Sequence, residues 1–559
     1  MHQQFLSTVR AFDPAPSLAP GLRFVDESPA HPDRFSDEDC LLSLFAALRT
    51  TGIPAVLLDL TLEPQQRWDS DGRVCEQTND DVLPKPQLLK ILKSESLGSI
   101  IQSLQSEALL EYSISESGYI IYSLPSDWQT LRSQLLARPQ SEQQFEALKF
   151  LCFICPRDRF LSGSLAPSRY PAYAHSAIIF NILKAVLEEM TIEPVPFSLR
   201  NELIEVMLSA SLEGDRANKD DSLQLALSYM DDGTPEYLKV EATYRKSVLL
   251  RLAGNVNASE DCLQPRLTAY RPRSRPRRLH AAYGRIHISH LENLILLGKH
   301  VQASEEMDDW QCADDPTLLE LRLRFAKSIT DSKIHRAQGN FSEVVALLSR
   351  LPQQPAEPSY FRVICSLADA YTDLGSTEES QSKLTAEIVR LRHRNRSAVY
   401  KPLRRLLVSS VDAFVQSESF GLVEEPIKEI KMVYRTRFDL DISDQLLHVR
   451  VLIASARTLQ CTSRPVEALE EWDSVKRCVR KYSSFVTGFT YAVACLSQSL
   501  MLMQDRRKEA AMEHFEEARC VLSMNEADYC IPGLVRWADW AEEEIFRNEG
   551  WKIDRRMAE

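Results

Sequence analysis

Glycines recur at a regular interval through the C-terminal two-thirds of this chain. They stand about 36 to 46 residues apart, at Gly254, Gly298, Gly339, Gly375 and Gly421. This interval is the period of helical-hairpin repeats, in which a glycine suits the tight turn between two packed helices. The spacing therefore predicts a solenoid of helix pairs rather than a common catalytic fold.

Apolar residues three and four positions apart support the same interpretation, because that spacing marks the buried face of a helix. The chain has 559 residues, of which 44% are apolar and only 17 are glycine. Such a composition can bury a continuous core and disfavours a loop-rich α/β enzyme. The predicted fold class is mainly α. The apolar sets are Ile288, Leu291 and Ile295; Phe361, Ile364, Leu367 and Tyr371; and Leu446, Val449 and Ile453.

The N-terminal part shows a different pattern. Residues 1–35 are proline-rich and predict an irregular arm, and Ser36 to Asp39 resemble a capping box before a first helix. Two short helices are expected between Lys85 and Leu109, followed by a β-hairpin at 109–123 that is the only β structure predicted. We expect a winged-helix-like module at 36–140, a helical linker at 141–200 and a tetratricopeptide-like solenoid at 201–559.

Charge and composition limit the partners of the chain. The formal net charge is −13, with 66 basic and 79 acidic residues, which disfavours nucleic acid as a partner. The 12 cysteines are scattered as in a reduced compartment, and no apolar run is long enough for a signal peptide or a membrane span. We expect a soluble, cytoplasmic protein without a membrane partner, with the nucleus as the alternative compartment.

Two segments resemble the turn between the helices of a tetratricopeptide repeat. They are Gln338 to Val344 and Leu374 to Ser380, each with a glycine, a polar turn and the start of a second helix. Looser versions lie at Leu297 to Ala303 and at Arg464 to Ala468. The resemblance covers residues 201–545 and implies an irregular solenoid that binds partners.

The N-terminal third resembles a linker found in fungal signal-transduction (STAND) NTPases of the NB-ARC/NACHT type. The likeness rests on the hairpin at 109–124, on Ala147 to Arg157 and on Tyr170 to His175. In that family the winged helix belongs to a nucleotide switch. This chain lacks the phosphate-binding loop, because Gly298-Lys299 is followed by His300 and lies between repeat helices. The resemblance implies a remnant without its nucleotide-binding core.

Two groups of residues have side chains of the kinds that bind metals. Cys152 and Cys155 stand in an apolar helix with no second ligand pair, so we expect them in the core. His280, His287 and His290 form the densest histidine cluster, with Arg285 between them, but no carboxylate or cysteine stands at ligand spacing in the same turn. We expect a solvated or partner-facing helix surface there and predict no metal.

A run of five arginines is the strongest cluster of like charge and a candidate contact for a partner or for nuclear import. Pro272 and Pro276 are expected to keep it out of a helix, so that its cations extend toward an acidic peptide, a phosphate or an import receptor. A solvated loop is the alternative. The run consists of Arg271, Arg273, Arg275, Arg277 and Arg278.

The remaining signals favour binding over catalysis. The helix at 96–109, which would read DNA in a winged helix, contains no lysine or arginine. The sequence shows no nucleophile elbow, phosphate loop or catalytic triad order, so no catalytic residue and no cofactor are predicted. We expect a non-enzymatic protein–protein interaction scaffold or adaptor that uses a helical-repeat groove. The alternative is a regulator of transcription or of a specialised metabolic pathway.

Overall fold

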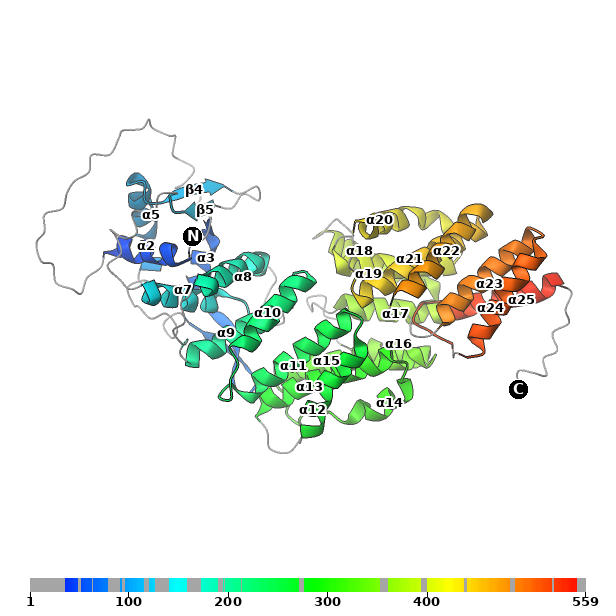
Figure 1. The fold of residues 1–559 in the computed structure, drawn as a ribbon, viewed down its shortest axis with the longest axis horizontal. Helices are drawn as coiled ribbons and strands as arrows, with labels where there is room; N and C mark the ends of the chain where they lie inside the picture. The colour runs from blue at the N-terminus through cyan, green and yellow to red at the C-terminus, as the bar shows by residue number, and fades with distance from the viewer. Residues whose placement is uncertain are drawn as a thin grey trace, which may run out of the picture. The chain divides into compact units, whose positions relative to one another are not determined.

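The computed structural model shows a mainly α protein, as the sequence predicted, with 76% of the described residues helical (Figure 1). Two compact units form, one from residues 1–69 and 74–235 and the other from 70–73 and 236–559. The described residues are 36–48, 52–62, 64–78, 91–92, 96–114, 120–125, 140–157, 172–189, 195, 197–212, 214–270, 276–351, 360–393, 400–436, 440–482, 488–524 and 527–549.

The first unit begins with the predicted capped helix, α2 (Asp37–Leu48). The backbone N–H of Asp39 donates to the hydroxyl oxygen of Ser36 at 3.1 Å, and the N–H of Ser36 donates to the Asp39 carboxylate at 3.2 Å. This reciprocal pair satisfies two donors at the helix start and confirms the expected capping box. The short elements β1 (Ile53–Pro54), α3 (Val56–Asp59) and η1 (Leu60–Leu62) follow.

The predicted hairpin is present as β4 (Glu111–Ile114) and β5 (Ile120–Ser123), which pair antiparallel after helix α5 (Leu97–Ser106). β1 pairs with the other edge of β5, so the strand order is β1-β5-β4. A hairpin that follows helices is the arrangement predicted for this part of the chain, and its assignment as a winged-helix-like module stays a prediction. The first of the two short helices predicted after Lys85 falls mostly outside the described residues.

The prediction that this hairpin is the only β structure is wrong. A second hairpin pairs β2 (Gln65–Trp68) with β3 (Val74–Gln77), in addition to β1. Their sequences, QQRW and VCEQ, lack the apolar alternation that marks a half-buried strand. Backbone pairing around a turn with Gly72 at a φ of 73° forms the hairpin, so periodicity alone could not reveal it.

Four more helices of the first unit lie within its described residues. Helix α7 packs against α2, α8 and α9, and α9 packs against α10. The sequence placed the start of the solenoid at residue 201, whereas α9 and α10 belong to the first unit and the second unit resumes at Glu236. The helices are α7 (Gln140–Ile154), α8 (Ala172–Glu189), α9 (Phe197–Ala210) and α10 (Arg216–Ser228).

In the described part of the second unit, seven helix pairs follow one another and a last helix, α25 (Leu534–Glu549), packs on α23. Consecutive helices pack together in sequence order, which is the packing of a helical repeat (Figure 1). The pairs are α11 (Glu236–Leu252) with α12 (Val256–Ala269), α13 (Arg277–Leu296) with α14 (His300–Glu305), α15 (Leu318–Ala337) with α16 (Phe341–Ser349), α17 (Tyr360–Leu374) with α18 (Thr377–Arg392), α19 (Lys401–Gln416) with α20 (Glu424–Arg435), α21 (Ile442–Cys461) with α22 (Pro465–Lys481), and α23 (Phe489–Gln504) with α24 (Lys508–Leu522).

Every one of these pairs is joined by the same backbone turn. A residue with a left-handed φ ends the first helix, and the next residue donates its N–H to a carbonyl five positions earlier, as Asn255 does to Leu250 at 2.9 Å. This bond defines a Schellman turn. The left-handed residues are Gly254, Gly298, Gly339, Gly375, Glu418, Ser463 and Arg506.

The glycine spacing located four of these turns correctly and one wrongly. Gly421 lies in the short helix η5 (Phe420–Leu422), and the turn of that pair is at Glu418 with a φ of 56°. The turns at Ser463 and Arg506, with φ of 58° and 60°, also lack glycine. Glycine lowers the cost of a left-handed φ but is not obligatory, so a count of glycines could not find them.

Buried ion pairs tie the first helices of four successive pairs together. The guanidinium of Arg450 on α21 donates to Asp369 on α17 at 2.9 Å and to Asp412 on α19 at 2.8 Å. Arg336 on α15 bonds Asp369 at 2.8 Å and Asp373 at 3.2 Å. These ion pairs are almost fully buried, so each charge depends on its partners.

The segment before α25 packs on the same helices. The backbone N–H of Gly533 donates to the carboxylate of Asp373 at 2.7 Å, and Arg536 donates to the carbonyl of Asp373. The ring of Tyr529 packs edge-on against Phe341 with centroids 5.4 Å apart. The end of the array therefore contacts its middle, and α11 contacts α21. The second unit folds back on itself rather than leaving this face of α15 and α17 open.

Candidate functional site

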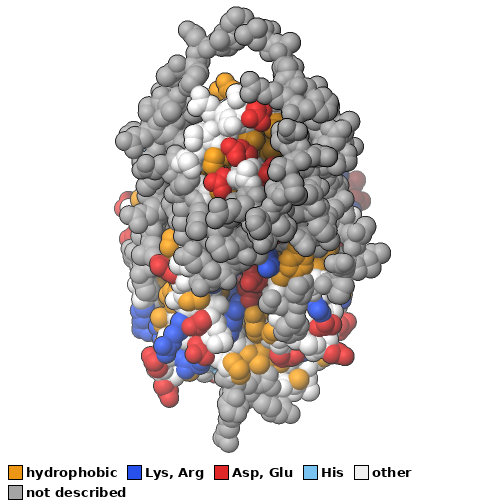
Figure 2. Space-filling model, turned by 90° about the vertical axis from the view of Figure 1, so that its left-hand side faces the viewer, with side chains coloured by type: hydrophobic (Ala, Val, Ile, Leu, Met, Phe, Trp, Pro, Cys, Tyr) orange, Lys and Arg blue, Asp and Glu red, His pale blue; other side chains and the backbone are white. Residues whose placement is uncertain are grey.

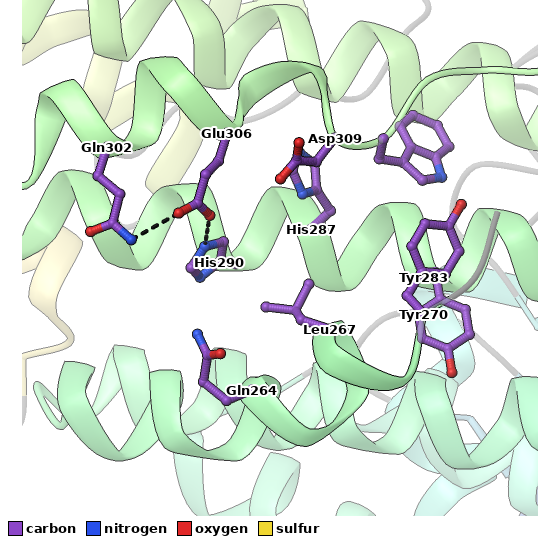
Figure 3. Close-up of a pocket in the computed structure, with 10 residues that line it drawn as sticks. Gln264, Leu267, Tyr270, Tyr283, His287, His290, Gln302, Glu306 and Asp309 are labelled. Carbon is purple, nitrogen blue, oxygen red and sulfur yellow. Dashed lines mark hydrogen bonds and ion pairs between the residues drawn. The ribbon is translucent and has the colours of Figure 1, made fainter.

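A cavity of about 390 Å³ opens between α12, α13 and α14 (Figure 3). Its floor consists of the buried side chains of Tyr283, His287, His290 and Trp310. Its rim is formed by exposed polar side chains from the two flanking helices and from the residue after η4 (Glu306–Asp308). The lining residues are Gln264, Leu267, Tyr270, Tyr283, His287, His290, Gln302, Glu306, Asp309 and Trp310.

Helical spacing brings these side chains to the cavity. Residues four and seven positions apart share a face of a helix, as do Tyr283, His287 and His290 on α13. Gln264 and Leu267 share a face of α12, and Figure 3 shows them across the open space from Gln302 and Glu306. The cavity is thus a property of three packed helices and not of one segment.

His290 lies between two carboxylates from different helices. Its Nδ1 is 2.5 Å from the Glu260 carboxylate, and its Nε2 is 2.6 Å from the Glu306 carboxylate. Burial disfavours the charged imidazole, but the two hydrogen bonds outweigh that effect and raise the pKa of His290. Burial likewise opposes ionisation of Glu260 and Glu306, and the bonds to His290 nonetheless help to lower both pKa values. The three groups form a charged chain, Glu−–His+–Glu−.

The outer ends of this chain are held in place by amide groups. Asn293 donates to Glu260 at 3.1 Å, and Gln264 donates to the same carboxylate at 2.5 Å. Gln302 donates to Glu306 at 2.8 Å. Because both ring nitrogens of His290 are bonded, the imidazole has no free nitrogen with which to exchange a proton with a substrate.

The other two histidines have different surroundings. Burial lowers the pKa of His287 to about 4, so its ring is neutral, and its Nε2 faces the carbonyl of Met307 at 3.4 Å. His280 stacks on Trp310 with ring centres 5.3 Å apart, and its Nδ1 is 2.8 Å from the hydroxyl of Tyr270. His280 therefore supports the aromatic side of the cavity rather than lining it.

Trp310 closes that aromatic side and packs directly on the backbone of α13. A Cβ at Gly284 would lie 2.5 Å from the ring of Trp310, so only glycine fits there. The indole N–H donates to the carbonyl of His280 at 3.1 Å. Gly284 stands inside a helix, and its role was not evident from the sequence because the ring comes from a segment more than a full helix away.

The expectation of a solvated histidine surface is wrong for His287 and His290, whereas the alternative of a partner-facing surface stays a prediction. Both are buried, with 5% and 3% of their surface exposed, because α13 is covered by α11, α12, α14 and α15. The sequence shows no carboxylate at ligand spacing in the same turn, and the structure brings Glu260 and Glu306 from other helices. Arg285, between the histidines, pairs with Glu241 on α11 at 2.6 Å.

The arginine run is partly described. Arg271, Arg273 and Arg275 lie outside the described residues. Arg277 and Arg278 form the first turn of α13, with Pro276 as its N-cap, so the expectation that prolines keep them out of a helix is wrong. A proline favours a helix start, where its missing N–H is not needed. Arg277 pairs with Glu320 at 3.0 Å, and Arg278 lies 4.1 Å from the centre of the Tyr237 ring.

Cys152 and Cys155 are core residues, as predicted. Both are fully buried, and burial raises the pKa of each thiol to about 12. Thiols with such pKa values stay protonated, so the pair has the properties of apolar packing rather than of a redox centre.

Among the described residues, the side chains of Cys495, His514 and Glu517 lie close enough to hold a metal ion. Glu517 is already paired with Lys476 at 3.5 Å and accepts a hydrogen bond from Tyr491 at 2.5 Å. Burial raises the pKa of Cys495 to about 11, and its thiol faces the Glu517 carboxylate at 3.5 Å. A lysine next to a protonated thiol disfavours a cation, so we interpret the group as an ion-pair cluster.

Two features of the chain concern nucleic acid and membranes. Helix α5 contains neither lysine nor arginine, and on the face drawn in Figure 2 the acidic, basic and apolar side chains of the described residues are intermixed. Within the described part of the chain, no helix combines the length and the apolarity that a membrane span needs.

Searches against known protein families and among curated proteins find no match for this chain. The class that the fold defines is a mainly helical protein in which many consecutive helices pack in the manner of a helical repeat.

Proposed function

We propose that this protein is a non-enzymatic scaffold or adaptor that binds a protein or peptide partner in a groove of its helical repeats. The observation that carries the proposal is the cavity between α12, α13 and α14, which opens on the surface of an array of helix pairs. Repeat arrays bind by shape and by a few anchor residues, and this cavity has a rigid aromatic floor and an exposed polar rim.

Two further features support binding rather than turnover at this site. Both nitrogens of His290 are bonded to carboxylates, and His287 is neutral and faces a backbone carbonyl. Such groups are fixed in place, whereas a general acid or base must reach the reacting atom.

We also propose a tetratricopeptide-like class for the array and a winged-helix relationship for the first unit. The support for the former is a glycine-type turn between the paired helices, as at Gly339 and Gly375. The support for the latter is the strand order β1-β5-β4 beside α2 and α5. In this proposal the first unit is a remnant of a nucleotide-switch protein, and the chain binds neither ATP nor GTP.

The function is tested by isolating a partner and reconstituting the complex. A protein that co-purifies with the full chain is produced separately and titrated calorimetrically, and we expect saturable binding near one-to-one. Leu267→Trp, which fills the half-buried side of the cavity, should weaken this binding. Ala269→Trp places the same ring at an exposed position of α12 and should not.

Two results would refute the function. One is the absence of any partner that rebinds stoichiometrically after purification. The other is saturable binding of ATP or GTP at low micromolar concentration, which would indicate a nucleotide-dependent enzyme.

A further inference from the structure

We propose that the cavity is an anchor site for a cation, namely the lysine or arginine side chain of a basic partner peptide. The proposal rests on the function proposed above and adds the chemistry of the partner. The chain itself carries a net charge of −13, which favours a basic partner overall, but the specific argument comes from the atoms that line the cavity.

The charges of the cavity do not cancel. The carboxylates of Glu260 and Glu306 flank the single imidazolium of His290, and Asp309 adds a third carboxylate at the exposed rim. The nearby Lys327 is directed elsewhere, because its ammonium donates to the carbonyl of Trp310 at 2.9 Å and to Asp308 at 3.3 Å. The lining therefore carries an excess of one negative charge, and Glu260, which is bonded to His290 but does not line the cavity, adds a second.

The hydrogen-bonding groups of the cavity are mainly acceptors. The amide nitrogen of Gln264 donates to Glu260, and that of Gln302 donates to Glu306, so each amide keeps its oxygen as an acceptor and one N–H as a donor at the rim. The two N–H groups of His290 are likewise used by carboxylates. An ammonium or guanidinium group supplies donors and positive charge, whereas a phosphate or carboxylate would meet acceptors and repulsion.

The aromatic side of the cavity suits the same ligand. Trp310 and Tyr283 are buried with 1% and 3% of their surface exposed, and the ring of Tyr270 lies 4.8 Å from that of Tyr283. The apolar stem of a lysine or arginine packs on such rings where they line the cavity. Glu306 and Asp309 line the same cavity, and their carboxylates can bind the charged end of the side chain.

The test uses short fluorescein-labelled peptides that carry lysine or arginine at a fixed central position, with glutamine-centred peptides for comparison. Fluorescence anisotropy with the full chain should show binding of the basic peptides and at least about tenfold weaker binding of the glutamine peptides. N-acetyl-lysine amide serves as the free-cation probe. If it binds at the cavity and no basic peptide does, the ligand is a small cation and the peptide assignment is overturned.

A pair of matched variants separates the cavity from general electrostatics. Gln302→Lys places a cation one helical turn from Glu306, where it competes with the peptide side chain. Ser304→Lys makes the same change of net charge about 200° around the same helix, away from the cavity. We expect Gln302→Lys to weaken binding of the basic peptides about tenfold and Ser304→Lys less than about twofold.

Equal effects of the two variants would overturn the proposal, as would equal binding of basic and glutamine peptides. Either outcome leaves the broader function standing if the purified partner still binds the Gln302→Lys chain. If no purified partner binds the wild-type chain, the proposed function itself is refuted.

Discussion

The residues that define the cavity come from α12, α13 and α14, from η4 and from the bend after it, and several have a specific physical task. Gly284 makes room for Trp310, Trp310 forms the aromatic side, and His290 joins two carboxylates that are 30 and 16 residues away in the chain. None of these tasks is visible in the local sequence, because each depends on which helix packs next to which.

Gly284→Ala tests the close contact between α13 and Trp310. The added Cβ would lie 2.5 Å from the ring, so the indole or the helix must shift, at a cost of about 1–3 kcal/mol. We expect a lower melting temperature by differential scanning fluorimetry. Gly421→Ala is the control, since a Cβ there meets nothing within 4 Å and should leave the melt unchanged. Equal melts for both variants would show that Trp310 does not pack on Gly284.

His290→Gln tests the charged chain through its pH dependence. The pKa of His290 is raised in the folded state, so its stabilising contribution is complete below the unfolded pKa of about 6.5 and is lost as pH rises through the raised value. Near pH 5.5 the substitution should lower the free energy of unfolding by about 2 kcal/mol, and the difference should shrink at alkaline pH. Urea unfolding across pH measures this.

The control for that experiment is His335→Gln, since His335 is about a third exposed beside Asp331. It should show little change at any pH. A constant difference between wild type and His290→Gln from acid to alkaline pH would mean that His290 is neutral when folded.

At the scale of elements, the repeated Schellman turn organises the second unit. The same left-handed residue and the same hydrogen bond end the first helix of each pair, whether the residue is glycine or not. The second helix of each pair begins two residues after the left-handed residue. In the pair whose turn is at Glu418, η5 begins at this position. This constancy explains how helices of different lengths form a regular array.

Glu418→Gly tests whether that turn has been located correctly. A left-handed φ costs a non-glycine residue about 1 kcal/mol, so glycine at position 418 should raise the stability by about 0.5–1 kcal/mol. Thermal denaturation followed by circular dichroism measures the gain. An unchanged or lower melting temperature would mean that the strained position lies elsewhere in the pair.

The parts of the fold that were predictable are those written into local sequence. Glycine at Gly254, Gly298, Gly339 and Gly375 marks a left-handed turn directly, and Ser36 with Asp39 marks a helix start. Glycine spacing did not reveal the turns at Ser463 and Arg506, since ordinary residues take up a strained φ there, and only the first was indicated by the repeat-like segment Arg464 to Ala468. The cavity was not predictable either, because Glu260 and Glu306 meet His290 only after folding.

At the scale of the second unit, the buried ion pairs around Arg450 connect helices that are distant in sequence. Asp369, 81 residues before Arg450, receives bonds from two arginines. Burial opposes ionisation of Asp369, but Arg450 and Arg336 outweigh that effect and lower its pKa. The network therefore depends on α15, α17, α19 and α21 being in register.

Arg450→Met tests the network. The substitution keeps the length of the side chain but leaves Asp369 and Asp412 buried without their partner, which should lower the free energy of unfolding by about 3–5 kcal/mol. Urea denaturation measures the loss. Adding Asp412→Asn should recover part of it, because one unpaired charge is removed. Additive losses in the double variant would contradict a shared network.

The central claim is that a partner binds this helical array at the cavity between α12, α13 and α14. Hydrogen–deuterium exchange of the full chain, with and without the purified partner, tests it most directly. The account predicts that the partner slows exchange in peptides that cover residues 256–270, 283–291 and 300–310. It also predicts that the partner slows exchange in these peptides less in the Gln302→Lys chain. Protection confined to other helices, with these peptides unchanged, would contradict it.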